Sequence, residues 1–217
     1  MTKERMLSQL QQSGLVVVIR RPHPDHVFPL IEALVEGGAG ALEITMDTVG
    51  APEIIKKVKK DYGDRALVGA GTVLNKDQAL LAIEHGADFI FSPSFNEKVV
   101  KLTNDHNKIS IPGVYTPTEI VNAYEAGADL VKIFPAGGLG PNYIKDLQGP
   151  LGHIPMLPTG GVSLDNVDQF IKSGCFGVGV GGSLLTKSIL TEQRWDDLKE
   201  LTEKYISAIR AARKETL

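Results

Sequence analysis

The sequence predicts a (β/α)8 barrel, an α/β fold in which eight parallel strands alternate with helices, with an additional N-terminal helix and a long C-terminal helix. Three observations lead to this prediction. Apolar segments typical of buried strands alternate with amphipathic segments along the 217 residues. A short phrase that ends a helix and begins a strand occurs four times, and two glycine-rich segments follow the last two predicted strands.

The recurring phrase marks junctions between helices and strands. It reads EGGAGALEI from Glu36, EHGADFIFS from Glu84, EAGADLVKI from Glu125 and, more loosely, KSGCFGVGV from Lys172. In each copy a glycine suits the left-handed residue that ends a helix, and the small residue after it suits a tight connection into a strand. The phrase therefore predicts repeated helix-to-strand units.

Eight apolar segments are predicted as strands. They are residues 15–20, 41–45, 66–70, 88–92, 109–114, 129–134, 155–158 and 176–180. Strand starts recur roughly every 20–26 residues, which suits a compact barrel of about 200 residues. The alternative is an open, doubly wound parallel sheet. We prefer the barrel because strands and helices alternate throughout and the candidate phosphate-binding segments come late in the chain.

Amphipathic segments between the strands are predicted as helices. They include residues 25–36, 75–85, 117–126 and 164–173. Asn75 and Asp165 are expected to be N-caps, and Pro117 falls in a first turn, where its missing N–H is harmless. A last long helix is expected over 192–213, and its apolar face consists of Trp195, Leu198, Leu201, Tyr205, Ile206 and Ile209.

Length and composition restrict the class of function. A chain of 217 residues with 42% hydrophobic residues can form one core, so we expect a single domain over 1–217. Its net charge of -3, with scattered basic residues, does not suit nucleic acid or an acidic membrane surface. Small solutes are the expected partners. A lone cysteine, Cys175, a polar N-terminus and the lack of a long apolar stretch predict a cytoplasmic protein.

A lysine lies in the middle of an apolar predicted strand, within ADLVKIFP at 128–135. Burying an ammonium group is costly unless it is paired or loses its proton. Because Val131 and Ile133 suit the side that faces the helices, Lys132 is expected to point into the barrel. The same alternation in the second predicted strand points Glu43 inward. The two side chains are therefore expected to face each other across a small enclosed space.

Two interpretations of this pair are open. One is a buried salt bridge, which stabilises a fold only weakly because desolvation offsets the attraction. In the other, an apolar pocket lowers the pKa of Lys132, and the neutral amine attacks a ketone to form a Schiff base. Glu43 would then move protons as general acid and base, directly or through a water. A protonated imine accepts electrons and so permits cleavage of a carbon–carbon bond.

Two glycine-rich segments follow the seventh and eighth predicted strands. They read PTGGVS at 158–163 and GVGGSL at 179–184. Loops after strands seven and eight are where barrels most often bind phosphate, through backbone N–H groups and the N-terminus of a short helix. The pair favours a phosphate or similar anion over the alternative that the glycines only make tight turns. Ser183 offers an additional hydroxyl donor.

Two adjacent arginines follow the first predicted strand. Either both are solvated charges, or Arg20 leans over the mouth of the barrel and binds a carboxylate, for which the planar guanidinium is suited. The alternation of strand residues does not decide between Arg20 and Arg21. A metal site is not expected, because the five histidines lack close ligand spacing; they are His23, His26, His85, His106 and His153.

Seven segments in the same order carry a family resemblance over nearly the whole chain. They are VVVIRR at 16–21, ALEIT at 41–45, VGAGTVLN at 68–75, FSP at 91–93, VKIFPA at 131–136, PTGGV at 158–162 and GVGGSLL at 179–185. Together they resemble the 2-keto-3-deoxy-6-phosphogluconate (KDPG)/4-hydroxy-2-oxoglutarate (KHG) aldolase family. The resemblance implies a class I (β/α)8 aldolase without metal or other cofactor, usually a homotrimer. Such an enzyme cleaves a 2-keto-4-hydroxy acid to pyruvate and an aldehyde, which is glyceraldehyde 3-phosphate in the main reaction.

The resemblance also implies roles for individual residues. Lys132 would form the Schiff base and Glu43 would act as acid and base. The pyruvyl group would be bordered by Thr72, Pro93 and Phe134. The phosphate end would be held by Gly160, Gly161, Gly182 and Ser183, with Thr159 beside them as a further substrate-binding residue.

One residue departs from the family pattern. Asp47 stands where better-studied members commonly carry an arginine that holds the substrate carboxylate, and an aspartate would repel that group. Either Arg20 supplies the missing cation or the substrate differs; the intact glycine segments favour the first.

Two other functions stay open. One is a phosphate-binding isomerase or synthase in which Lys132 only balances charge, and the other is a non-catalytic barrel that binds a sugar phosphate.

Overall fold

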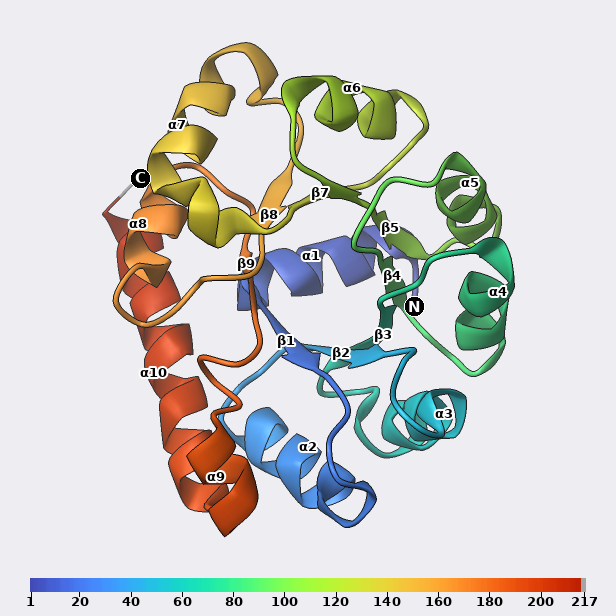
Figure 1. Cartoon of the computed structure of the whole chain (residues 1–217), viewed down its shortest axis with the longest axis vertical. Helices are drawn as coiled ribbons and strands as arrows, with labels where there is room; N and C mark the ends of the chain where they lie inside the picture. The colour runs from blue at the N-terminus through green and yellow to red at the C-terminus, as the bar shows by residue number, and fades with distance from the viewer. Residues whose placement is uncertain (216–217) are drawn as a thin grey trace.

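The computed structural model describes residues 1–215, which form parallel sheets surrounded by helices (Figure 1). The strands are β1 (Leu15–Ile19), β2 (Ala41–Thr45), β3 (Leu67–Gly71), β4 (Phe89–Phe91), β5 (Ile109–Ile111), β6 (Gly113–Val114), β7 (Val131–Ile133), β8 (Met156–Pro158) and β9 (Val178–Val180). One sheet has six strands in the order β5, β4, β3, β2, β1, β9, and the other has the order β6, β7, β8. The six-stranded sheet curls into a half-barrel, which confirms the parallel α/β prediction.

Helices alternate with the strands along the chain. They are α1 (Lys3–Ser13), α2 (Val27–Glu36), α3 (Ala51–Tyr62), α4 (Lys76–Glu84), α5 (Glu97–Asp105), α6 (Pro117–Glu125), α7 (Gly140–Leu151), α8 (Val167–Lys172), α9 (Lys187–Glu192) and α10 (Trp195–Lys214). Short 3-10 turns, η1 (Pro24–His26) and η2 (Ala136–Gly138), precede α2 and α7. Within residues 1–215, no helix combines the length and apolar character needed to cross a membrane.

The two sheets approach each other at two places. Pro112 separates β5 from β6, so the predicted strand over 109–114 is split; proline has no N–H for a strand ladder. Its carbonyl still accepts a hydrogen bond from the backbone N–H of Lys132 at 2.8 Å. On the other side, Thr159 and Gly179 form an isolated parallel bridge that links the end of β8 to β9.

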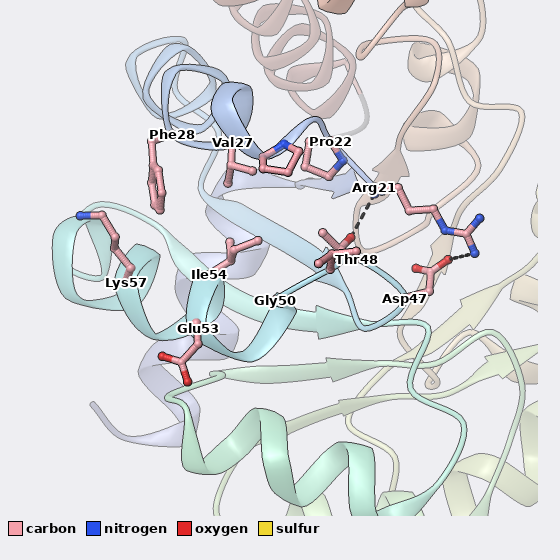
Figure 2. A pocket seen from close by; sticks show the side chains of 12 residues that line it. Arg21, Pro22, Val27, Phe28, Asp47, Thr48, Gly50, Glu53, Ile54 and Lys57 are labelled. Carbon is pink, nitrogen blue, oxygen red and sulfur yellow. Dashed lines mark hydrogen bonds and ion pairs between the residues drawn. The ribbon is translucent and has the colours of Figure 1, made fainter.

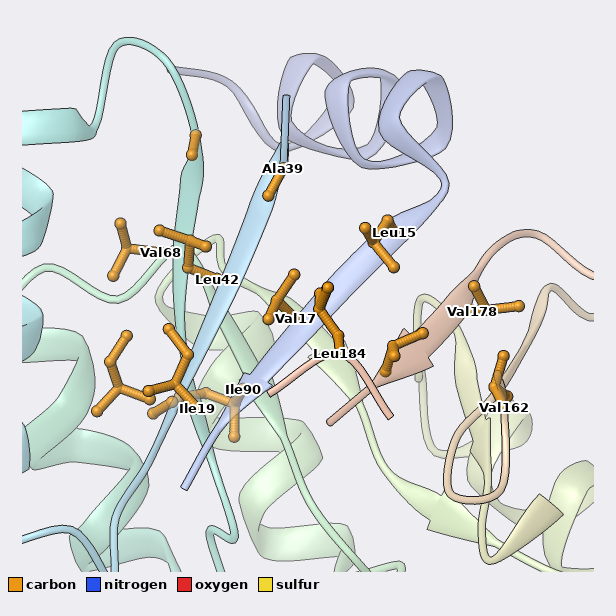
Figure 3. Packing of buried hydrophobic residues seen from close by; sticks show 14 of the residues in the cluster. Leu15, Val17, Ile19, Ala39, Leu42, Val68, Ile90, Val162, Val178 and Leu184 are labelled. Carbon is orange, nitrogen blue, oxygen red and sulfur yellow. The ribbon is translucent and has the colours of Figure 1, made fainter. Parts of the chain in front are cut away.

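Apolar side chains lie in two separate clusters, one on each face of the strands. The larger cluster fills the space between strands and outer helices, and Figure 3 shows part of it, including Leu42 and Val68. The smaller cluster lies inside the curl of the sheets, where Met6 and Leu10 of α1 meet strand residues such as Phe89. In Figure 1, α1 crosses the centre of the ring of helices. Helix α1 therefore contributes to the inner core.

The predicted alternation of strand residues is confirmed at β2 and β7. Leu42, Val131 and Ile133 belong to the outer cluster, whereas Ala41 and Leu130 belong to the inner one. Glu43 and Lys132, two residues further along in each case, have the same parity as these inner residues. The backbone therefore directs both charged side chains toward the interior.

The recurring phrase has the predicted backbone geometry. Gly38, Gly86, Gly127 and Gly174 all have φ between +90° and +97°, the left-handed region that favours glycine. Two copies continue with an aspartate that ties neighbouring elements together. Asp88 accepts a hydrogen bond from the backbone N–H of Val68 and ion-pairs with Lys59, at 3.1 and 2.7 Å.

Of the three expected helix-start residues, two are confirmed and one is wrong, and the last helix, expected from residue 192, begins at Trp195 because Glu192 ends α9. Asn75 caps α4 by accepting a hydrogen bond from the backbone N–H of Gln78 at 2.9 Å, and Pro117 lies in the first turn of α6. The prediction of Asp165 as an N-cap is wrong, because α8 begins at Val167. There Asn166 precedes the helix, and its side chain closes the preceding turn instead of capping it.

Candidate active site

Lys132 is held inside the sheets by β7 and is only 5% exposed. Its Nζ lies 4.1 Å from the ring centroid of Phe91 and 4.6 Å from that of Phe134. Burial lowers the pKa of Lys132; Glu43 opposes this shift and Arg20 adds to it. The site therefore favours a neutral amine more than water does.

Glu43 is completely buried on β2. Within residues 1–215, neither carboxylate oxygen of Glu43 has a hydrogen-bond partner. In the same residues, no lysine or arginine nitrogen lies within 4.0 Å of either oxygen, the distance that defines an ion pair. Burial raises the pKa of Glu43 to about 7, and the positive charges of Lys132 and Arg20 limit the increase. The geometry therefore argues against the salt-bridge interpretation, because a structural pair would be in contact.

Glycines on β3 make room for this carboxylate. A Cβ atom at Gly71 would collide with the side chain of Glu43, and one at Gly69 would collide with the ring of Phe89. β3 pairs with β2 so that Glu43 is level with Gly69. The glycines in VGAGT thus leave the space that the acid occupies inside the strands.

A cavity of about 520 Å³ opens beside Lys132 and brings most of the predicted site together. Its lining includes Arg20, Lys132, Phe134, Thr159, Gly160, Gly161, Gly182 and Ser183. Three predicted residues lie outside that lining. Glu43 couples electrostatically to Lys132, Thr72 contacts Arg20, and the backbone of Pro93 lies against Gly113.

The cavity also has lining residues that the sequence interpretation did not name, including Val18, Val162 and Ser163. Val18 is level with Glu43 in the pairing of β1 with β2. The alternation of strand residues could have found it, because Val16 in the same strand belongs to the inner cluster. Val162 and Ser163 belong to the predicted segment PTGGVS, although the sequence interpretation gave neither of them a role.

Glycine suits the two segments for different reasons. Gly160 and Gly161 have φ of +82° and +84°, so their backbone conformation itself favours glycine. Gly182 has no such constraint, and a Cβ atom there would meet no atom of the described part of the chain within 4 Å. The open space at Gly182 suits close approach of a ligand to the backbone, as anion-binding loops require.

The hydroxyl of Ser183 is already engaged within the protein. It donates a hydrogen bond to the carbonyl of Val162 at 2.6 Å and accepts one from the hydroxyl of Tyr205 at 3.2 Å. The hydroxyl proton that we expected to serve an anion is therefore directed at a backbone carbonyl in this arrangement.

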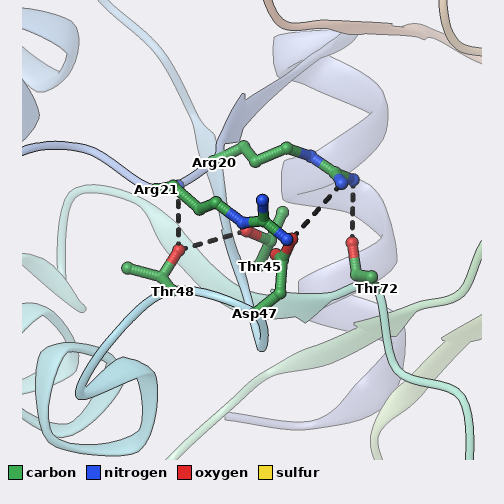
Figure 4. Close-up of polar contacts among 6 residues, drawn as sticks. All are labelled: Arg20, Arg21, Thr45, Asp47, Thr48 and Thr72. Atoms are coloured by element: carbon green, nitrogen blue, oxygen red, sulfur yellow. Dashed lines mark hydrogen bonds and ion pairs between the residues drawn. The ribbon is translucent and has the colours of Figure 1, made fainter.

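Arg20 lines the cavity and Arg21 does not. Figure 4 shows the polar contacts of the two arginines with Asp47, Thr48 and Thr72. Arg20 donates a hydrogen bond to the Thr72 hydroxyl at 2.9 Å and lies 3.5 Å from Asp47. Arg21 makes the shorter ion pair with Asp47, at 2.8 Å. Burial opposes ionisation of Asp47, but the Thr45 hydroxyl and both arginines outweigh it and hold its pKa below the usual range.

A larger hollow of about 650 Å³ lies on the other side of Asp47, between α2 and α3 (Figure 2). Its lining is mainly apolar and includes Pro22, Phe28, Ile54 and the exposed Val49. Neither Lys132 nor Glu43 contributes to it. Because it lacks the titratable pair, this hollow is a weaker candidate for a reaction site than the cavity beside Lys132.

Comparison with known proteins identifies the family of this chain. The family model described as "KDPG and KHG aldolase" matches residues 6–201. The chain belongs to the KDPG and KHG aldolase family. It is 34% identical over 211 residues to the 2-dehydro-3-deoxy-phosphogluconate aldolase of Haemophilus influenzae, covering 96% of this chain and 99% of that protein. It is 32% identical over 196 residues to the 2-dehydro-3-deoxy-6-phosphogalactonate aldolase of Escherichia coli, covering 90% and 96%.

Solved structures of this family have the same fold. A native KDPGal structure matches with a TM-score of 0.86 at 32% identity, covering 92% of this chain and 96% of that one. KDPG aldolase from Legionella pneumophila, with pyruvate captured as a covalent carbinolamine, matches with a TM-score of 0.83 at 26% identity, covering 91% and 96%. A thiamine phosphate pyrophosphorylase from Pyrococcus furiosus, at 24% identity and a TM-score of 0.72, covers 94% and 98% and shares the fold alone.

Replacing Glu43 tests its environment through the pH dependence of stability. The folded protein holds the Glu43 proton up to about pH 7, whereas the unfolded chain releases it near 4.5, so the protein loses stability as pH rises through that window. Glu43→Gln has no proton to lose. Its free energy of unfolding minus that of the unmodified protein should increase between about pH 4 and pH 8, by on the order of 3 kcal/mol.

Urea denaturation across this pH range measures the difference. Glu200→Gln, on the exposed face of α10, is the matched control and should show no such trend. A difference for Glu43→Gln that stays constant with pH would mean that Glu43 ionises like an exposed glutamate.

Proposed function

We propose that this protein is a class I aldolase that cleaves KDPG to pyruvate and glyceraldehyde 3-phosphate. The observation that carries the proposal is the buried Lys132 amine, whose lowered pKa the charge of Glu43 only partly opposes, beside a cavity that ends at two glycine loops. The Glu43 carboxylate has no hydrogen-bond partner within residues 1–215. Membership of the aldolase family supports it, as does the covalent pyruvate carbinolamine in the Legionella relative. KHG, which would yield pyruvate and glyoxylate, is proposed as a second substrate.

The proposed reaction begins when neutral Lys132 attacks the C2 ketone of the substrate. The resulting carbinolamine takes a proton from the protonated carboxyl of Glu43 and loses water, which gives a protonated imine and leaves Glu43 as a carboxylate. Glu43, as carboxylate, removes the proton of the C4 hydroxyl, and the electron pair of the C3–C4 bond moves into the imine as the aldehyde leaves. The enamine then takes a proton at C3, and hydrolysis releases pyruvate and regenerates the amine. No cofactor takes part in this sequence.

The acidity of Glu43 suits both directions of proton transfer. A group with a pKa of about 7 is present in both forms near neutral pH, so it can accept and return a proton within one turnover. Burial also keeps bulk water from competing for the proton. The two alternative functions, an isomerase or synthase and a non-catalytic barrel, are less well supported. In either of them Lys132 would only balance charge, and it would then need a partner in ion-pair contact.

We propose that Arg20 binds the substrate carboxylate and that the glycine loops, with Thr159, bind the phosphate. Arg20 lines the cavity that contains Lys132, and its guanidinium is anchored by Thr72. Thr72, Pro93 and Phe134 are proposed to border the pyruvyl group. The Zymomonas mobilis KDPG aldolase solved with 3-phosphoglycerate, at 27% identity and a TM-score of 0.83, covers 97% of this chain and 99% of that one.

We further propose that the two sheets form one closed (β/α)8 barrel, with β5 and β6 acting as a single strand, in a single domain over 1–217. The junctions at Pro112 and at Thr159 support closure.

We propose a cytoplasmic homotrimer from the family resemblance. A 32% identical chain with a TM-score of 0.85 belongs to a cage designed by fusing symmetric oligomeric domains, which supports an oligomer. A crystal structure tests both ideas through an uninterrupted ring and a threefold axis.

Trapping the covalent intermediate tests the proposed chemistry. Incubation with pyruvate and borohydride should add about 72 Da to Lys132, the mass of pyruvate less water plus two hydrogens. Peptide mass spectrometry locates the adduct, and Lys132→Ala should remain unmodified. An unmodified Lys132 in the native protein, or an adduct on another lysine, would refute the mechanism.

The carboxylate site is tested by comparing three substitutions around Asp47. Arg20→Ala should raise KM for the keto acid roughly ten- to a hundredfold, because it removes charge-assisted hydrogen bonds. Asp47→Ala should change KM little, since Asp47 lies 3.5 Å from Arg20 and pairs more closely with Arg21. Arg21→Ala is the matched control, a neighbouring cation outside the cavity. A larger increase in KM from Asp47→Ala than from Arg20→Ala would contradict this assignment.

A further inference from the structure

A chain of hydroxyl groups joins the C-terminal helix to both glycine loops. The Tyr205 hydroxyl on α10 donates to Ser183 Oγ at 3.2 Å, and Ser183 Oγ donates to the Val162 carbonyl at 2.6 Å. Ser183 follows β9 and Val162 follows β8. Ser183 therefore links the two segments that line the phosphate end of the cavity, and Tyr205 of α10 holds the hydroxyl that makes this link.

Tyr205 is well suited to hold this contact. It is 1% exposed, and its neighbours Ile206 and Ile209 are buried in the same helix face. Burial raises the pKa of its phenol, with Ser183 and the Leu164 backbone opposing, so the hydroxyl keeps its proton and donates it. Because a buried hydroxyl with a defined partner is already ordered, little conformational entropy is lost there when a ligand binds.

The direction of these hydrogen bonds determines what the loops offer an anion. Ser183 has one hydroxyl proton, and the Val162 carbonyl receives it. The hydrogen bond from Tyr205 occupies an acceptor site on the same oxygen and limits rotation of the hydroxyl. The Ser183 hydroxyl thus acts as a brace between the loops, and an anion is left to the backbone N–H groups around Gly182.

We propose that Tyr205 is a positioning residue for phosphate recognition, acting through Ser183 to hold the two glycine loops at the spacing that a phosphate group requires. This inference rests on the proposed function, because it assigns the loops to the substrate phosphate. It adds a residue outside the cavity, on the last helix, to the determinants of affinity for phosphorylated substrates.

Tyr205→Phe tests the proposal because it removes the hydroxyl and keeps the ring. It should raise both KM for KDPG and the inhibition constant of inorganic phosphate roughly fivefold, the equivalent of one neutral hydrogen bond. The pyruvate concentration that gives half-maximal borohydride trapping should stay within about twofold, because pyruvate does not reach the loops. In a Ser183→Ala background, Tyr205→Phe should add no further effect, because the two residues act as one unit.

Tyr62→Phe on α3 is the matched control and should leave all three quantities unchanged. Equal changes in the phosphate and pyruvate measurements would indicate a general structural role and overturn the proposal, as would no change in either. Failure of the proposed function gives a different result: the unmodified protein would then show no pyruvate adduct on Lys132. A trapped adduct together with an unaffected phosphate constant in Tyr205→Phe would overturn only the role of Tyr205.

Discussion

The structure depends on the cost of keeping two ionisable groups away from water. Lys132 and Glu43 lie in the interior and form no ion pair with each other, so each is more easily held neutral than in solution. For a structural core this arrangement would be a defect, because a closely paired or apolar alternative is more stable. For Schiff-base chemistry it is the requirement, since it provides an amine that can attack and an acid that can exchange its proton near neutral pH.

Several parts of the fold serve this one constraint. Helix α1 adds Met6 and Leu10 to the inner core, and Phe91 and Phe134 place rings against the amine. Gly71 leaves space for the carboxylate. At the other end of the cavity glycines expose the backbone, so the proposed phosphate site is separated from the apolar surroundings of Lys132. Asp47 extends this separation, because it pairs mainly with Arg21 and leaves Arg20 lining the cavity.

Much of this site could be predicted from sequence because strand alternation and glycine punctuation are local signals. Alternation alone directed Lys132 and Glu43 inward, and the two glycine segments indicated the anion end. Contacts made by freely rotating or distant groups could not be predicted. The hydroxyl of Ser183 depends on Tyr205, which is 22 residues away. The turn that replaces an Asp165 cap likewise depends on hydrogen bonds that no periodicity encodes. The break at Pro112, in contrast, could have been predicted, because proline has no N–H for a strand ladder.

The central claim is that the interior lowers the pKa of the Lys132 amine, and nuclear magnetic resonance can measure that pKa directly. Lysine labelled with ¹³C at Cε, with Lys132→Met to assign the signal, gives its titration curve. The account predicts a midpoint below the ordinary lysine value of 10.5 and a still lower midpoint in Glu43→Gln, because Glu43 favours the charged amine. A midpoint at or above 10.5 would show that the amine is stabilised as an ammonium ion and would contradict the account.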